Sequence, residues 1–338
     1  LGTRGSDFMK REIYIFNNGE LRRKDNTLLF ETEEGKKYIP VEEINNVWVF
    51  GELTINKSLL DFISQKEICI HFFNYYGYYS GTYYPREHLN SGYVILKQAE
   101  HYLDYEKRMV LAKEIIKTGS KNIIVILKYY NSRGIDLNKT IQSINFKVDS
   151  MDTASSIQEL MALEGNIRDE YYVCLNDIIK NPDFTFYVRS RRPPLDNINA
   201  LISFGNSLMY TTVLGEIYQT TLDPRIGYLH STNERRFTLN LDIAEIFKPV
   251  IVDRTIFSLL NRGEITKKDF DKSFNGILLT ERGKKRFIEE YNRKLETVIK
   301  HPRLNTNVSY KRLIRLELYK IQKHITENHE YKGFVARW

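Results

Sequence analysis

Short apolar runs separated by turn residues predict β-structure in the first quarter of the chain. The run Arg11–Phe16 ends at Asn17–Gly19, where a tight hairpin turn is expected, and Glu33–Lys36 predicts another hairpin. Between the later strands, Asn56–Lys66 has the periodicity of a helix. The other expected strands are Leu28–Thr32, Lys37–Pro40, Val47–Phe50, Ile68–Phe73 and Tyr78–Tyr84. Together these segments predict a small twisted β-domain with one inserted helix.

Apolar positions recur at helical spacing in the rest of the chain. The segment Lys311–Lys323 is amphipathic, which favours a packed helix over a DNA-contacting one, and the tail after His324 is expected to be loose. The other expected helices are Tyr93–Lys117, Lys121–Asn131, Ser155–Lys180, Asn197–Thr220 and Arg282–His301. The predicted fold class is therefore α+β, with a small N-terminal twisted β-domain followed by a mostly α-helical domain.

The change in pattern also predicts the domain boundaries. Residues 1–8 precede the first methionine, Met9, and are interpreted as a vector remnant. The β-domain is expected to cover residues 9–84, a linker residues 85–92, and the helical domain residues 93–338.

One acidic residue interrupts the apolar face of the helix expected at residues 155–180. Leu160, Leu163, Ile167 and Tyr171 recur around Glu164 at helical spacing, which places Glu164 on their face. A carboxylate withdrawn from water stays protonated, pairs with a base or binds a metal ion. Glu164 is therefore a candidate functional residue.

A second segment supplies the partners for a metal site. His230 follows a glycine-containing turn, and Asp242 and Glu245, three residues apart, share a helix face. Carboxylates about 4 Å apart repel by roughly 4 kcal/mol at an effective dielectric of 20, so three in one pocket would require a divalent cation or protons. Oxygen ligands with one imidazole favour Mg²⁺ or Mn²⁺ over zinc. The alternatives are a pair of solvated surface acids and an interior histidine.

Basic residues near these acids suggest a phosphate-containing ligand. The run Arg189–Pro194 contains three arginines followed by two prolines, and arginine forks match phosphate geometry. The alternative is a surface loop that leads into the next helix, with Asp196 as its N-cap. Lys248 follows Glu245 and would place a positive charge beside a reacting phosphate.

Charge and cysteine content narrow the function classes. The net charge is +7, but residues 9–90 hold 10 Lys/Arg and 12 Asp/Glu, so the positive excess belongs to the rest of the chain. A basic surface around an acidic pocket suits a polyanion held near a metal, although a merely soluble basic domain is equally compatible. Only Cys69 and Cys174 are present, and no apolar run is long enough to span a bilayer, so a cytoplasmic protein is expected. The motifs of nucleotide-binding phosphate loops and of serine nucleophile elbows are missing.

Four motifs in order carry a family resemblance over Met9 to about His324. They are Leu163-Glu164-Gly165 with Arg168 and Tyr171-Tyr172, then Arg191–Pro194 with Asn199–Gly205, then Leu222–His230, and finally Asp242–Pro249. The chain thereby resembles the CRISPR-associated spacer-acquisition integrase family, Cas protein one. The resemblance implies that the helical domain is catalytic, in agreement with the placement of the acids above.

The resemblance also implies site residues and partners. The implied metal ligands are Glu164, His230 and Glu245, with Asp242 adjacent and Lys248 as a basic residue beside them; many members have Asp in place of Glu245. The residues expected to contact DNA are Arg168, Arg189, Arg191, Arg192, Tyr210, Arg225 and Lys248. The family dimerises through its β-domains and assembles with Cas protein two, so both partners are expected here, together with prespacer and CRISPR-repeat DNA.

The implied reaction is attack of a prespacer 3′-hydroxyl on a phosphodiester of the CRISPR repeat, assisted by Mg²⁺ or Mn²⁺. With water as the nucleophile the same site would be a DNA endonuclease. One alternative is a stand-alone metal-dependent nuclease or resolvase of branched DNA. Another, from a different class, is a structural DNA-binding subunit whose acids serve only the fold.

Overall fold

The computed structural model of the chain describes residues 10–86, 89, 91–191, 193–232, 237–273, 276–300 and 306–337. The chain divides into two compact units, residues 1–90 and residues 91–338, and this boundary falls within the expected linker at 85–92. The expected vector remnant at 1–8 lies outside the described residues.

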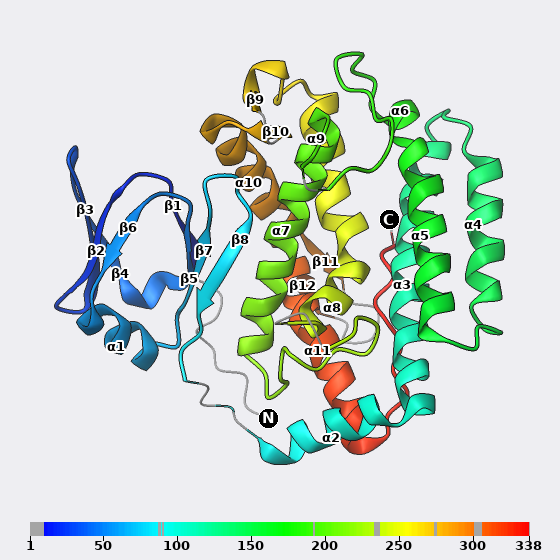
Figure 1. Cartoon of the computed structure of the whole chain (residues 1–338), viewed down its shortest axis with the longest axis horizontal. Helices are drawn as coiled ribbons and strands as arrows, with labels where there is room; N and C mark the ends of the chain where they lie inside the picture. Colours follow the sequence, from blue (N-terminus) through cyan, green and yellow to red (C-terminus); the bar gives the residue numbers. More distant parts are fainter. Residues whose placement is uncertain are drawn as a thin grey trace. The chain divides into compact units, whose positions relative to one another are not determined.

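The described residues of the β-unit form two four-stranded sheets (Figure 1). The first has the order β1-β5-β7-β8, in which β1, β5 and β7 are parallel and β8 is antiparallel to β7. The second has the order β4-β3-β2-β6. The elements are β1 (Arg11–Ile15), β2 (Gly19–Lys24), β3 (Thr27–Thr32), β4 (Gly35–Pro40), η2 (Val41–Glu43), β5 (Ile44–Val49), β6 (Leu53–Ile55), α1 (Lys57–Gln65), β7 (Cys69–Phe73) and β8 (Tyr79–Tyr83). The core between them is apolar and includes Leu21, Val47, Leu59, Phe62 and Ile70.

Two turns in this unit show where local pattern succeeds and where it fails. The hairpin expected at Glu33–Lys36 joins β3 to β4 and is confirmed. The hairpin expected at Asn17–Gly19 is wrong, because β1 and β2 belong to different sheets. Gly19 is needed there for close approach, since a Cβ atom would clash with the carbonyl oxygen of Glu31 on β3. Strand β2 itself was not predicted, because Leu21 is its only buried side chain.

The second unit is mostly helical, so the predicted fold class is confirmed (Figure 1). The long helix α3 packs against α2, α4, α5, α8 and η3, and α8 packs against both α3 and α7. The helices are α2 (Gly92–Leu103), α3 (Tyr105–Asn131), α4 (Asn138–Ser150), α5 (Ile157–Val173), α6 (Leu175–Ile178), α7 (Asn197–Tyr218), α8 (Leu239–Lys248), η3 (Pro249–Asp253), α9 (Arg254–Asn261), η4 (Lys267–Asp269), α10 (Glu281–Glu296) and α11 (Tyr310–Glu327). Two short hairpins are formed by β9 (Phe270–Ser273) with β10 (Gly276–Leu279) and by β11 (Val298–Lys300) with β12 (Asn307–Ser309).

The long helix α3 differs from the helices predicted by periodicity both in where it begins and in having no gap before Lys121. The single helix expected at Tyr93–Lys117 is broken at Asp104, whose side chain accepts a hydrogen bond from the backbone N–H of Lys107 and caps α3. The gap expected before Lys121 does not exist, because Gly119 lies inside α3 at its contact with α8. Helices α4 and α9 were not predicted.

The C-terminal residues also differ from expectation. The tail expected to be loose is packed, with Tyr331, Phe334 and Ala336 all buried. Cys69 and Cys174 are both buried. Within the residues that the structure describes, no helix has the length and hydropathy needed to cross a bilayer.

Candidate active site

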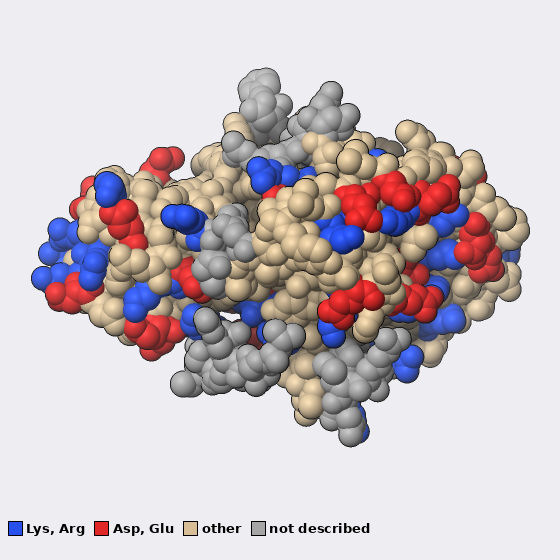
Figure 2. All heavy atoms as spheres, turned by 90° about the horizontal axis from the view of Figure 1, so that it is seen from below, with Lys and Arg blue, Asp and Glu red and all other residues tan. Residues whose placement is uncertain are grey.

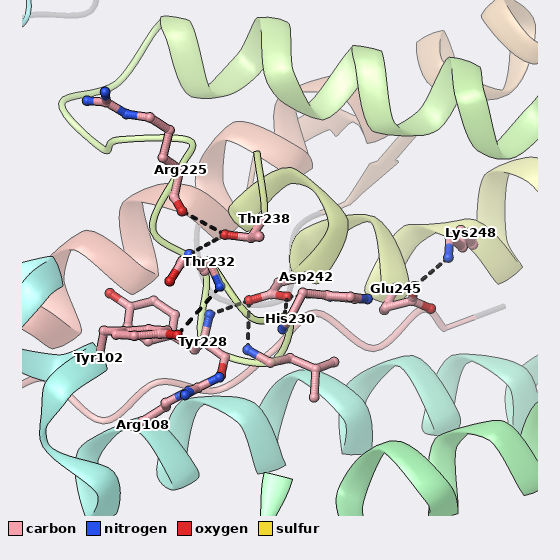
Figure 3. A network of polar contacts seen from close by, with 12 residues as sticks. Tyr102, Arg108, Arg225, Tyr228, His230, Thr232, Thr238, Asp242, Glu245 and Lys248 are labelled. Carbon is pink, nitrogen blue, oxygen red and sulfur yellow. Dashed lines mark hydrogen bonds and ion pairs between the residues drawn. The ribbon is translucent and has the colours of Figure 1, made fainter. Parts of the chain in front are cut away.

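The carboxylate of Asp242, on α8, is completely buried and organises the loop that carries His230 (Figure 3). Its Oδ2 accepts hydrogen bonds from the backbone N–H groups of Tyr228 (2.5 Å) and Leu229 (3.0 Å). Its Oδ1 accepts one from the backbone N–H of His230 (3.1 Å) and lies 2.7 Å from the imidazole Nδ1 of the same residue. A carboxylate that serves three N–H donors is an acceptor, so we assign the imidazole proton to Nδ1. Figure 3 shows the ring of His230 extending from Asp242 toward Glu245.

Helices α2 and α3 hold the same loop from its other side. Gln98 Oε1, on α2, accepts a backbone N–H of the loop at 2.7 Å, and Arg108 Nε, on α3, donates to the carbonyl of Tyr228 at 2.7 Å. The loop also approaches the start of α8 so closely that a Cβ atom on Gly227 would lie 2.8 Å from the carboxylate of Asp242. The position of His230 is therefore determined by three helices.

A single guanidinium joins the two acids expected to bind metal. Arg168, four residues after Glu164 on α5, donates from Nε to Glu164 Oε1 at 3.0 Å. Its Nη2 donates to Glu245 Oε2 on α8 at 2.7 Å, and its side chain is 10 % exposed. Arginine suits this position because its planar fork can serve two carboxylates at once. Glu164 and Glu245 are thus brought together, as the sequence suggested, but through a base between them.

Lys248 pairs with the other oxygen of Glu245. Its Nζ contacts Glu245 Oε1 and lies 4.8 Å from the ring centre of Tyr210, on α7. Burial alone would raise the pKa of Glu245, but the charges of Lys248 and Arg168 outweigh burial and lower it to about 2. Burial lowers the pKa of Lys248, but the Glu245 carboxylate opposes this and raises that pKa above its usual value.

These ion pairs correct one expectation. The sequence suggested that clustered carboxylates would require a cation or proton uptake to offset their repulsion. In the structure, Arg168 and Lys248 balance the charges of Glu164 and Glu245, and hydrogen bonds from the His230 loop satisfy Asp242. The repulsion between these carboxylates is therefore offset by bases of the chain itself.

The chemistry of the site nevertheless fits a hard divalent cation. Glu164, Glu245 and Arg168 line one small pocket together with Gly119 and Ser120 of α3. Carboxylate oxygens and an imidazole nitrogen are suitable ligands for Mg²⁺ or Mn²⁺. Among the described residues, no three His, Cys, Asp or Glu side chains are arranged as a metal-binding cluster. In the structure the oxygens of Glu164 and Glu245 are paired with Arg168 and Lys248.

The residues expected to contact DNA fall into three groups. Arg168 is buried between the acids, so its position is within the site and away from a DNA surface. Arg189 is partly buried and donates to Asn199 Oδ1 (2.8 Å) and Ser203 Oγ (3.1 Å) of α7, which fixes the loop before that helix. The predicted N-cap of α7 by Asp196 is present, since its carboxylate accepts from the backbone N–H of Asn199. Both roles match the alternative of a loop that leads into α7.

The other basic residues remain candidates for DNA contact. Arg191 is exposed, and Arg225 is 70 % exposed on its side chain while it pairs with Asp223. Arg192 lies outside the described residues. Lys248 and Tyr210 lie beside Glu245.

The sequence suggested a basic surface around an acidic pocket, and the distribution of charged side chains on the surface bears on this expectation. On the face shown in Figure 2, acidic and basic side chains are interleaved, with runs of red as long as the blue ones. A continuous basic surface is thus not seen on this face, and the net charge of +7 does not by itself locate a DNA path.

Sequence reasoning missed one buried acid next to the site. Asp253, at the end of η3, is 4 % exposed, and burial raises its pKa to about 6 despite the positive charge of Arg168. The hydroxyl of Tyr171 is close enough to influence this carboxyl, although neither Tyr171 Oη nor Asp253 Oδ2 has a hydrogen bond of normal geometry. The signal was available, because Asp253 ends the apolar run Pro249–Val252 in the same way that Glu164 interrupts an apolar face.

Fold and site together define a two-unit α+β protein with an acid–histidine centre in its helical unit. The family model described as CRISPR associated protein Cas1 matches residues 13–293. The chain therefore belongs to the CRISPR-associated protein Cas1 family, as its motifs suggested.

Curated relatives and solved structures agree with this membership. A CRISPR-associated endonuclease Cas1 of Thermodesulfovibrio yellowstonii is 56 % identical over 98 % of this chain and 100 % of its own length. A CRISPR-associated endonuclease Cas1 of Thermotoga maritima is 50 % identical, over 93 % of this chain and 96 % of its own. The structure of a Cas1 protein from Thermotoga maritima superposes with a TM-score of 0.87 and 47 % identity, covering 97 % of this chain and 100 % of that one.

A more distant structure shares the fold alone. A casposase bound to integration product has a TM-score of 0.85 at 20 % identity, covering 96 % of this chain and 93 % of that one.

Proposed function

We propose that this chain is a metal-dependent DNA integrase of CRISPR adaptation. It joins prespacer 3′-hydroxyl ends to the CRISPR repeat by phosphodiester transesterification, and with water as nucleophile it acts as a DNA endonuclease. The observation that supports the proposal is that Arg168 joins Glu164 on α5 to Glu245 on α8, with Lys248 paired to Glu245. The ring of His230 is directed toward the same Glu245 (Figure 3). Membership in a family whose curated relatives are named endonucleases supports it.

Each residue has a distinct part in this reaction. Glu164, His230 Nε2 and Glu245 would hold a Mg²⁺ or Mn²⁺ ion, which when bound lowers the negative charge on the scissile phosphate and favours the ionised nucleophile. Asp242 acts through His230, because its bond to Nδ1 leaves Nε2 as the ligating nitrogen. Lys248 offsets negative charge that develops on the phosphate. The reaction replaces one phosphodiester bond by another. It therefore needs no energy from a nucleoside triphosphate.

The assembly is proposed on the same basis. We infer a homodimer formed through the β-unit, a complex with Cas protein two, and a cytoplasmic location. A solved complex that contains Cas1 and Cas2 shares this fold at 17 % identity, which is consistent with such a complex. Arg191, Arg192, Tyr210, Arg225 and Lys248 remain the proposed contacts to prespacer and repeat DNA.

The decisive experiment supplies the chain with Cas protein two, a prespacer and a supercoiled repeat plasmid, with Mg²⁺ or Mn²⁺. We expect Glu164→Gln and His230→Ala to abolish the covalent prespacer–repeat product, and Asp242→Asn to reduce it by about 10- to 100-fold. Asp169→Asn is the matched control, because Asp169 is an exposed acid on the same helix as Glu164. We expect this control to keep full activity.

Two other outcomes would favour the rival functions. If the plasmid is nicked but no joined product forms, the chain is a nuclease or resolvase of branched DNA. If Glu164→Gln changes no DNA reaction, the acids serve only the fold and the chain is a structural DNA-binding subunit.

A further inference from the structure

The last described residues fold back onto the helical unit. Helix α11 ends at Glu327, and Asn328 adopts a left-handed conformation (φ 54°) that turns the chain. The following segment returns along α3 (Figure 1). We call residues 328–337 the C-terminal strap. Its buried side chains are Tyr331, Phe334 and Ala336.

One buried side chain, Asn122 on α3, fastens the strap to α8. Its Oδ1 accepts from the backbone N–H of Ala336 at 2.8 Å, and its Nδ2 donates to the carbonyl of Phe334 at 3.0 Å. The same Nδ2 donates to the carbonyl of Ile246 on α8 at 2.9 Å. Asn122 is completely buried, so each of these bonds is costly to lose. The side-chain amide of Asn122 on α3 therefore links the strap to α8.

The strap is held at two further points. The Tyr331 hydroxyl donates to the buried carboxylate of Glu317 on α11 at 2.6 Å. The backbone N–H of Gly333 donates to Glu114 Oε1 on α3 at 2.8 Å, and a Cβ atom on Gly333 would clash with Thr118. These contacts require glycine at this position and determine the register of the strap along α3.

The strap contacts α8 immediately next to Glu245. The ring of Phe334 stacks on Phe247 with centroids 6.0 Å apart. Ile246, whose carbonyl binds Asn122, is the residue between Glu245 and Phe247. From α3, Gly119 approaches so closely that a Cβ atom would lie 2.8 Å from the carbonyl oxygen of Glu245. The backbone of α8 is thus held against α3 at Glu245 and Ile246, and the strap packs on Phe247.

We propose that the C-terminal strap is a positioning element for Glu245. It keeps α8 seated on α3, so that the Glu245 carboxylate stays within reach of Glu164 and His230. Phe334 and Asn122 touch no reacting atom and act through α8. For its effect on catalysis the proposal rests on the integrase function above, but its structural part stands without it.

The test uses the full-length chain with Phe334→Ala, and Lys332→Ala as the matched control. Lys332 belongs to the same strap, but its side chain is 52 % exposed and forms a surface ion pair with Glu330. Hydrogen exchange resolved to α8 and to the strap is measured together with kcat and KM for strand transfer. We expect Phe334→Ala to speed exchange in α8 and to lower kcat by at least about tenfold, because small misplacements of a reacting group are costly.

DNA affinity and KM should change by less than about twofold, since the strap makes no proposed DNA contact. Phe334→Leu keeps an apolar side chain at the position and should restore most of kcat. If Phe334→Ala does not fold, Phe334→Leu should still show faster exchange in α8 than the unaltered chain, and unchanged exchange there would contradict the proposal. Faster exchange of the strap with unchanged exchange in α8 and unchanged kcat would overturn the proposal. If the unaltered chain gives no strand transfer, exchange in α8 alone decides the role of the strap, and the integrase function fails separately.

Discussion

The two units of this chain bury polar groups in opposite ways. The core of the β-unit is apolar, and its buried His71 is kept neutral because burial lowers its pKa to about 4. The helical unit instead buries charges in pairs, with Arg168 and Lys248 on either side of Glu245. Buried ion pairs are a poor source of stability compared with apolar packing. Charge is thus retained inside the unit that carries the proposed site and is excluded from the core of the other unit.

The largest effect should come from removing the shared acid. We expect Glu245→Gln to lower the free energy of unfolding by about 3–5 kcal/mol, because Arg168 and Lys248 would stay buried without their common partner. The measurement is unfolding in urea, monitored by a spectroscopic signal that reports on helix content. Glu245→Gln combined with Lys248→Met should cost less than the sum of the single changes, because one unpaired charge is removed. Additive costs would mean that the pair is not coupled.

Acid should weaken the β-unit before it affects these ion pairs. The folded-state pKa of His71 is about 4 and its usual value is 6.5, so its contribution to stability is present above pH 6.5 and lost as the pH falls toward 4. At ~1.4 kcal/mol per pH unit this amounts to about 3 kcal/mol. The stabilisation from Glu245, with a pKa of about 2, is lost only between its usual value of 4.5 and 2.

Hydrogen exchange at pH 7 and pH 4.5 can separate the two units. The exchange rates are first corrected for the intrinsic pH dependence of amide exchange. Between pH 7 and pH 4.5 we then expect protection against exchange to fall more in the β-unit than in α8. His71→Gln is the control, because it removes the titrating group and should make the change in the two units similar. Equal acid sensitivity in the unaltered chain would contradict the contrast between the two interiors.

The smallest effect is expected at the surface of the helical unit. Arg225→Gln should leave the free energy of unfolding within about 0.5 kcal/mol, because the side chain is 70 % exposed. It should weaken binding to all DNA sequences to a similar extent. It should also reduce the slope of log affinity against log salt concentration by about one. Fluorescence anisotropy at several salt concentrations measures this slope. An unchanged slope would remove Arg225 from the proposed DNA contacts.

Local pattern predicted much of the fold because it depends on neighbours in the chain. The face of α5 that holds Glu164, the cap of α7 by Asp196 and the hairpin between β3 and β4 all arise within a few residues. The same pattern failed at Asn17–Gly19, where the glycine serves a contact with a strand of the other sheet. It also failed for Asp104, because capping overrode continuous periodicity.

The sequence by itself determined the donor groups of the site, the helix faces that present them, and the family. Only the tertiary structure decided that Arg168 lies between two acids, that Asp242 holds His230, and that the tail is a strap. Arg168 and Glu245 are 77 residues apart, and Asn122 and Ala336 are 214 apart. Periodicity states which way a side chain faces on its own element. Which partner it meets depends on how distant elements pack, and that is set by the shape of the whole core.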